Sequence, residues 1–84
     1  DNHTPEAEML NREILQTVEA AVAKLPEDLR KAITLREMEG LSYEEIAQIM
    51  DCPIGTVRSR IFRAREVIAK DLRPLLDTSE DQRW

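Results

Sequence analysis

The sequence has few cysteines and few aromatic residues, the residue types that often stabilise domains with a small core. Among its 84 residues it has one cysteine, which cannot form an internal disulfide, and three aromatic residues, so its core must be mainly aliphatic. No apolar run approaches the roughly 20 residues that a membrane-spanning helix needs, and there is no signal-peptide pattern. The sequence therefore predicts a domain of the reducing cytoplasm that does not insert into membranes.

Candidates for catalysis and metal binding are also missing. His3 stands alone near the start of the chain, and Cys52 lies in a predicted turn. No group of cysteines and histidines has metal-ligand spacing. Glu44 and Glu45 are adjacent on a predicted helix, so their carboxylates do not converge on one site. We therefore expect no enzyme activity, no cofactor and no metal.

Length and composition set the size of the domain. A chain of 84 residues holds one domain with a small core, and 42% hydrophobic with 35% charged residues is typical of a folded globular domain. The chain begins at Asp1 rather than at a methionine. We therefore expect it to be a piece of a longer protein.

The formal net charge of -5 argues against a nucleic-acid partner, but the charge is unevenly distributed. Residues 1–51 carry a net charge of -7, residues 52–76 carry +4 and residues 77–84 carry -2. A basic block within an acidic chain indicates one surface for phosphate and another that repels it or faces a basic protein. Ordinary solvated helix faces would give the same pattern, so charge alone leaves both interpretations open.

Apolar residues recur at helical spacing in two segments of the first half of the chain. The first helix is expected to open at Thr4, with Pro5 at the first helical position. Pro26 separates it from a second helix, which should end near Gly40. The apolar stripe of the first helix consists of Leu10, Ile14, Val18, Ala21, Val22 and Leu25. The residues expected to face inward in the second helix are Leu29, Ala32, Ile33 and Met38.

Two further helices are expected in the second half. Ser42 and Glu45 form a capping-box pattern, which predicts a short helix over Tyr43–Met50 with Ile46, Ala47 and Met50 inside. A tight turn follows at residues 51–53, and a fourth helix runs from about Ile54 to Leu72. Its apolar stripe consists of Val57, Ile61, Ala64, Ile68 and Leu72.

These elements predict an all-α fold of four helices that contains a helix-turn-helix with a long recognition helix. The domain is expected to occupy residues 1–76. Residues 77–84 show no periodicity and are expected to form a flexible tail.

The face of the fourth helix opposite its apolar stripe carries the candidate function. Successive residues advance by about 100° around a helix, which places Arg58, Ser59, Phe62 and Arg63 away from the stripe. Arginine can bind guanine bidentately, and serine can bond to several base edges. An exposed Phe62 needs a partly apolar partner, which a thymine methyl or a deoxyribose would supply. The pattern favours DNA binding in the major groove.

A purely structural explanation of the same residues stays open from the sequence. In that alternative Phe62 is covered by another helix, and the arginines pair with acids of the first two helices. Arg60 and Arg65 flank the stripe on its two edges, where they can either reach phosphates or cover the core.

Two residues outside that face are candidates for contacts with the DNA backbone. Thr56 lies in the first turn of the recognition helix, where its hydroxyl or backbone N–H can either hold a phosphate or cap the helix locally. Arg36, near the end of the second helix, can either pair with a glutamate or contact the backbone of DNA.

The segment from residue 25 to residue 68 carries a family resemblance. It reads LPEDLRKAITLREMEGLSYEEIAQIMDCPIGTVRSRIFRAREVI. This string resembles region 4 of the extracytoplasmic-function sigma factors, especially the sigma-E type. The resemblance covers roughly half of the chain and spans the two helices of the helix-turn-helix in one register.

The resemblance implies that the domain binds the minus-35 element of promoter DNA as part of RNA polymerase holoenzyme. It implies that Arg58, Ser59, Phe62 and Arg63 approach bases and nearby backbone, and that Arg36 and Thr56 touch phosphate. The partners that it implies are double-stranded promoter DNA, the β-subunit flap of core RNA polymerase and an anti-sigma factor.

Two positions depart from the general helix-turn-helix pattern. Asp51 stands where a glycine is frequent, although aspartate can adopt the left-handed conformation at modest cost. Arg60 stands where an apolar residue is frequent, which indicates a partly buried structural role. Two other functions remain open: the effector domain of a dimeric response regulator, and a protein-interaction module that uses the acidic half.

Overall fold

The computed structural model describes residues 5–81, and the side chains of residues 5–76. It contains four helices: α1 (Pro5–Ala23), α2 (Glu27–Glu37), α3 (Tyr43–Met50) and α4 (Ile54–Asp81). The described residues form no strand, and α3, a short turn and α4 follow one another as a helix-turn-helix. The predicted all-α fold is confirmed.

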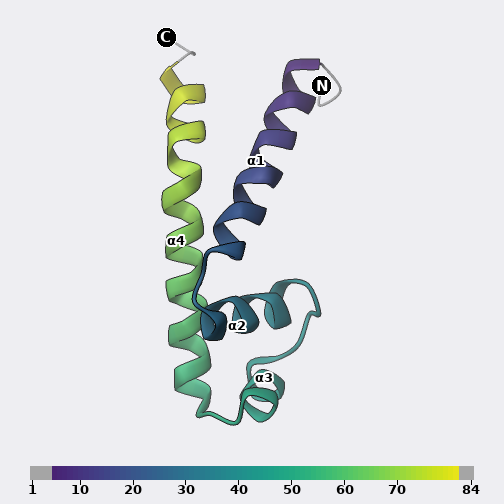
Figure 1. Ribbon diagram of the computed structural model, residues 1–84, viewed down its shortest axis with the longest axis vertical. Helices are drawn as coiled ribbons and strands as arrows, with labels where there is room; N and C mark the ends of the chain where they lie inside the picture. Colours follow the sequence, from purple (N-terminus) through teal and green to yellow (C-terminus); the bar gives the residue numbers. More distant parts are fainter. Residues whose placement is uncertain (1–4, 82–84) are drawn as a thin grey trace.

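The four helices form a compact lower part and two long arms (Figure 1). α2 crosses α4, and α3 lies at the end of the molecule where α4 begins. α1 and α4 run in opposite directions and diverge towards their outer ends. The longest dimension, 47 Å, reflects the length of α4, because a helix of its 28 residues is about 42 Å long.

The core lies where α2, α3 and the first half of α4 meet. The stripes predicted for the four helices supply it, with those of α2, α3 and α4 contributing most. Its buried residues are Leu25, Ala32, Ile33, Ile46, Val57, Ile61 and Ala64. Ala21 of α1 is also buried, whereas Leu10, Ile14 and Val18 are only half-buried. α1 is therefore less deeply packed than the other helices.

Pro5 is the first residue of α1, as the sequence predicts, and Thr4 lies outside the described residues. Lys24, just beyond the other end of α1, forms an ion pair of 2.7 Å with Asp71 of α4. The Lys24 side chain is largely exposed, so water screens this pair and its contribution to stability is small.

The end of α2 corrects one expectation. Met38 was expected to face inward, but it is 79% exposed. α2 ends at Glu37, and Gly40 adopts a φ of 71°, which only glycine tolerates easily. This turn lets the Leu41 N–H donate to the Leu35 carbonyl at 3.2 Å and brings Leu41 against the core in place of Met38.

The predicted capping box at the start of α3 is confirmed. The Glu45 N–H donates to Ser42 Oγ at 3.1 Å, and the Ser42 N–H donates to Glu45 Oε1 at 2.9 Å. The hydrogen bond from the Ser42 N–H to the carboxylate, followed by the interaction with the Ser42 side chain, lowers the pKa of Glu45. At the other end of α3, Asp51 adopts the left-handed conformation, with φ 53° and ψ 54°. The aspartate therefore performs the role for which glycine is frequent at this position.

α4 is longer than the sequence predicts. It continues to Asp81, whereas the expected end was Leu72. Pro74 lacks a backbone N–H and so removes one hydrogen bond, but the apolar stripe continues beyond it at Leu75, which is half-buried. The backbone of residues 77–81 is helical, and residues 82–84 of the expected tail lie outside the described residues.

The two adjacent positions Ile61 and Phe62 should respond in opposite ways to truncation. Ile61 is 1% exposed, and Ile61→Ala should reduce the free energy of unfolding by about 2–5 kcal/mol, the range for a large buried aliphatic side chain. Phe62 is 63% exposed, and Phe62→Ala should change that free energy far less. Thermal melts of both variants test this. A larger loss for Phe62→Ala would show that the rotation of α4 is wrong.

Candidate nucleic-acid interface

Burial of the apolar stripe fixes which side chains α4 presents to solvent. Val57 and Ile61 are buried to 0% and 1% exposure, so α4 cannot rotate without exposing them. The four residues predicted for the opposite face are all exposed: Arg58, Ser59, Phe62 and Arg63. The structure thus brings them together on one accessible surface, which we call the recognition face.

Phe62 is the most unusual member of the recognition face. At 63% exposure it lies in the open between arginines, and the alternative in which another helix covers it is wrong. Exposing an aromatic ring to water is unfavourable, and the fold gains no core packing from it. The arrangement suits a partner that combines negative charge with apolar groups, as phosphates, deoxyribose and thymine methyls do.

The four arginines in the first half of α4 fall into two groups. Arg60 Nε lies 3.6 Å from an Asp28 carboxylate oxygen, and its Nη1 lies 3.6 Å from the Cys52 sulfur. Its side chain is only 26% exposed, which agrees with the structural role expected from the sequence. For Arg60 the structural alternative therefore holds.

Arg65 is also paired with an acid of α2. Its Nη2 donates to Glu37 Oε2 at 2.7 Å. This hydrogen bond raises the pKa of Arg65, and Tyr43 adds smaller contributions in the same direction. By contrast, neither Arg58 nor Arg63 forms an ion pair within the described part of the chain. These two guanidiniums remain available for a ligand.

The two predicted phosphate contacts, Thr56 and Arg36, lie outside the recognition face as defined. The Thr56 N–H already donates to the Pro53 carbonyl at 3.0 Å, so any phosphate contact would depend on its side chain. Arg36 makes no ion pair with a described glutamate. Its Nη1 instead donates to the Leu41 carbonyl at 2.8 Å, which holds the guanidinium beside α3.

Tyr43, which no sequence pattern indicated, joins two of the predicted site residues. The Arg36 guanidinium carbon lies 5.0 Å from the centre of the Tyr43 ring, and that of Arg58 lies 5.8 Å from it. Both distances are within the range of cation–π attraction. The only sequence signal was a tyrosine at the first position of a short helix, which says nothing about contacts with α2 and α4.

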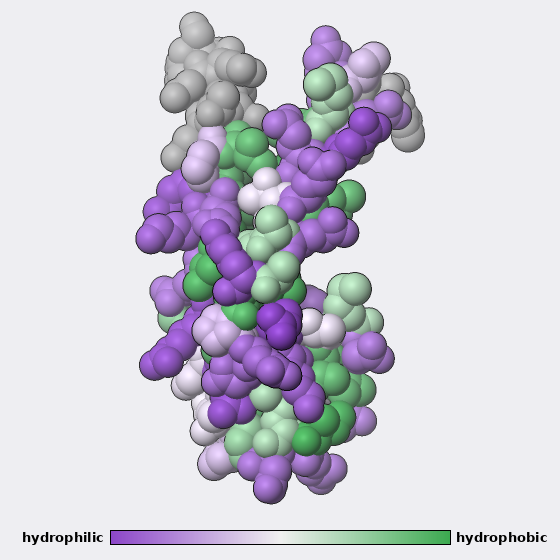
Figure 2. All heavy atoms as spheres, in the orientation of Figure 1, coloured by the Kyte–Doolittle hydropathy of each residue, from purple (hydrophilic) through white to green (hydrophobic). Residues whose placement is uncertain are grey.

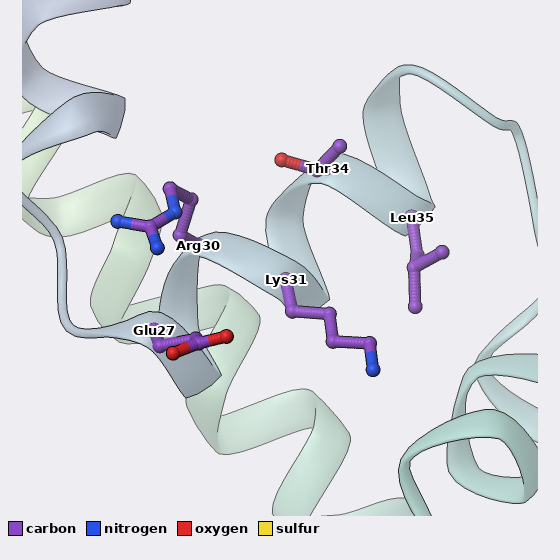
Figure 3. A pocket seen from close by; sticks show the side chains of 5 residues that line it. All are labelled: Glu27, Arg30, Lys31, Thr34 and Leu35. Carbon is purple, nitrogen blue, oxygen red and sulfur yellow. The ribbon is translucent and has the colours of Figure 1, made fainter.

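The surface also has depressions outside the recognition face. One runs along α2 and is lined by Glu27, Arg30, Lys31, Thr34 and Leu35 (Figure 3). It is shallow, and Arg30 is already used, since its Nη1 donates to the carbonyls of Ala23 and Leu25 at 3.3 Å each. This depression has no group of converging polar side chains that would fix a small molecule.

A second depression lies between α1, α2 and α4 and has a mainly aliphatic lining. We call it the apolar depression, and Val18, Val22, Ile33, Met38 and Ile68 form most of its wall. None of the six residues predicted for DNA binding belongs to it. The face of the molecule in Figure 2 is mostly hydrophilic. Hydrophobic patches interrupt it, one of them at the lower end where α3 lies.

No helix among the described residues is long and apolar enough to cross a bilayer. No group of three or more histidine, cysteine, aspartate or glutamate residues in this part of the chain is arranged to hold a metal ion.

Comparisons with known proteins agree with the geometry. The family described as Sigma-70, region 4 matches residues 15–68. The ECF RNA polymerase sigma-E factor of Haemophilus influenzae is 63% identical over 76 residues, which are 90% of this chain and 40% of that protein. The RNA polymerase sigma-H factor of Pseudomonas aeruginosa is 64% identical over 76 residues, 90% of this chain and 39% of that protein.

A third relative, the ECF RNA polymerase sigma-E factor of Escherichia coli K12, is 65% identical over 72 residues, 86% of this chain and 38% of that protein. The chain thus spans about two fifths of the length of the relatives that it matches.

The exposed arginines should affect DNA binding without affecting the fold. Arg58→Ala and Arg63→Ala should each weaken binding to a duplex selected by the chain by about 1–3 kcal/mol, the range for a bidentate contact with a base. The measurement is a binding titration, with circular dichroism to confirm native helix content.

Arg73→Ala is the matched control, because it removes the same charge from an exposed position near the other end of α4. An equal loss of affinity in this control would show that Arg58 and Arg63 act on DNA only through their positive charge.

Proposed function

Because this chain belongs to the sigma-70 region 4 family, we propose that it recognises the minus-35 element of promoters as part of RNA polymerase holoenzyme. In this proposal α4 enters the major groove, and residues 1–76 form the working domain. Promoter recognition places the protein in the cytoplasm, where the polymerase acts.

The observation that carries the proposal is the recognition face itself. Arg58 and Arg63 have no acidic partner among the described residues, and Phe62 is exposed between them. The face occupies the N-terminal half of α4, the part of a recognition helix that contacts base edges in this motif. Arg58, Ser59, Phe62 and Arg63 are the proposed base-proximal residues, and Arg36 and Thr56 are the proposed phosphate contacts.

The names of the relatives favour this function over the alternatives. All three relatives reported above are named as sigma factors, which disfavours a dimeric response regulator. The interaction module that uses the acidic half predicts no role for the recognition face, yet that face has the exposed arginines and phenylalanine that a DNA ligand requires.

Protein partners are proposed on a separate surface. We assign the apolar depression to core RNA polymerase, with the β-subunit flap as the contacting part, and an anti-sigma factor as a further partner. The support is its aliphatic lining and its separation from the six proposed DNA-binding residues, so that DNA and a protein can bind together.

The isolated chain should bind promoter DNA weakly. Residues 1–51 have a net charge of -7 against +4 for residues 52–76, and two arginines of α4 are already paired with acids. The chain therefore neutralises few DNA phosphates, so its affinity for DNA should fall only slowly as the salt concentration rises. Affinity must then come largely from the tether to the rest of the holoenzyme.

The test is a titration of the 84 residues against a minus-35 duplex at several salt concentrations. Detectable, sequence-dependent binding that is far weaker than holoenzyme binding is the expected result. Nanomolar binding by a dimer of the chain would instead favour the response-regulator alternative.

Met38→Glu should reduce association with core polymerase and leave DNA binding by the isolated chain unchanged. Met38 lines the apolar depression and is 79% exposed, so the charge can be introduced without disturbing the core. Met9→Glu is the matched control, since Met9 is similarly exposed on α1 but does not line the depression. A pull-down with core polymerase measures the effect, and equal binding by both variants would contradict the assignment.

A further inference from the structure

Tyr43 stands at the point where the three elements of the candidate interface meet. It is the first residue of α3, Arg36 belongs to the last turn of α2, and Arg58 belongs to the first half of α4. Both guanidinium carbons lie over its ring, at 5.0 and 5.8 Å from the ring centre. One aromatic ring therefore contacts a proposed phosphate-binding residue and a proposed base-reading residue.

The ring itself is held in place from two sides. The capping box formed by Ser42 and Glu45 fixes the backbone at the start of α3. The Tyr43 side chain is half-buried and packs against the core cluster. The position of the ring is thus set by the start of α3 and by the core, and the Tyr43 hydroxyl also interacts with Arg65, which is not one of the proposed DNA-binding residues.

The two arginines differ in how much they depend on this ring. Arg36 is held independently by its hydrogen bond of 2.8 Å to the Leu41 carbonyl. Arg58 has neither an ion pair nor a side-chain hydrogen bond within the described residues, so the Tyr43 ring is the contact that orients its guanidinium. A free arginine loses rotamer freedom when it binds a base, and an arginine already oriented loses less.

From this geometry we infer that Tyr43 is a positioning residue for DNA recognition, whose ring holds the Arg58 guanidinium in the orientation in which it contacts promoter DNA. The inference rests on the proposed function of the recognition face. The ring carries the effect and the hydroxyl is dispensable, because cation–π attraction involves the face of the ring.

Two substitutions separate the ring from the hydroxyl. Tyr43→Phe keeps the ring and should bind a minus-35 duplex within about twofold of the parent chain, whereas Tyr43→Leu should bind about fivefold more weakly, because Arg58 must then be ordered when the DNA binds. In the Arg58→Ala background, Tyr43→Leu should have no further effect, since the group that it positions is absent.

Unchanged or tighter binding by Tyr43→Leu would overturn the inference. So would a loss in Tyr43→Phe equal to that in Tyr43→Leu, which would assign the role to the hydroxyl. Additive losses in the double variant would show that Tyr43 does not act through Arg58. Circular dichroism checks folding, and Tyr43→Met replaces Tyr43→Leu if the latter unfolds.

A second readout needs no DNA and so separates this inference from the proposed function. In nuclear magnetic resonance spectra of the free chain, the Arg58 side-chain Nε–H signal should be shifted by the ring current of Tyr43. The shift should persist in Tyr43→Phe and disappear in Tyr43→Leu. An Arg58 signal without this shift in the parent chain overturns the inference even if the chain binds promoters. A chain that shows the shift but binds no promoter DNA would overturn the proposed function instead.

Discussion

The packing of Val57, Ile61 and Ala64 against α2 and α3 is the constraint on which the rest of the structure depends. These side chains are buried to 1% exposure or less, and Ile46 meets them from α3 with no exposed surface. Interiors this dense tolerate little rotation, since any rotation of α4 would open cavities and expose aliphatic groups. The core therefore determines the recognition face, although no residue of that face belongs to the core.

The same constraint decides which contacts the four arginines in the first half of α4 make. Residues on the flanks of the buried stripe lie within reach of α2, and there Arg60 meets Asp28 while Arg65 meets Glu37. Arg58 lies farther round the helix, where it reaches the Tyr43 ring, and Arg63 is exposed and forms no ion pair with a described residue. Four chemically identical side chains thus acquire different roles through their angle around one helix.

Local rules predicted most of the fold but not its ends or its contacts between helices. The capping box, the left-handed Asp51 and the stripe of α4 follow from spacing and backbone preference, and the four residues of the recognition face followed from the stripe. Met38 was misplaced because α2 ends at Glu37 rather than near Gly40, so Met38 no longer continues the buried stripe of the helix. Tyr43 was missed because its significance lies in two partners from other helices, and periodicity carries no information about such contacts.

Because the buried and exposed faces of α4 are separate, such a domain can change its DNA target with little effect on its core. Phe62 and Arg63 contribute little to the core, so substitutions there alter the ligand surface at nearly constant stability. Arg58 is less free, because its neighbour Tyr43 also packs against the core. A change of target that requires a different residue at position 58 would therefore remove one of the two arginines that lie over the Tyr43 ring, whereas a change at position 63 would disturb no such contact. Within this fold, the proposed base-reading positions are unequally constrained, and the constraint comes from an aromatic ring on a different helix.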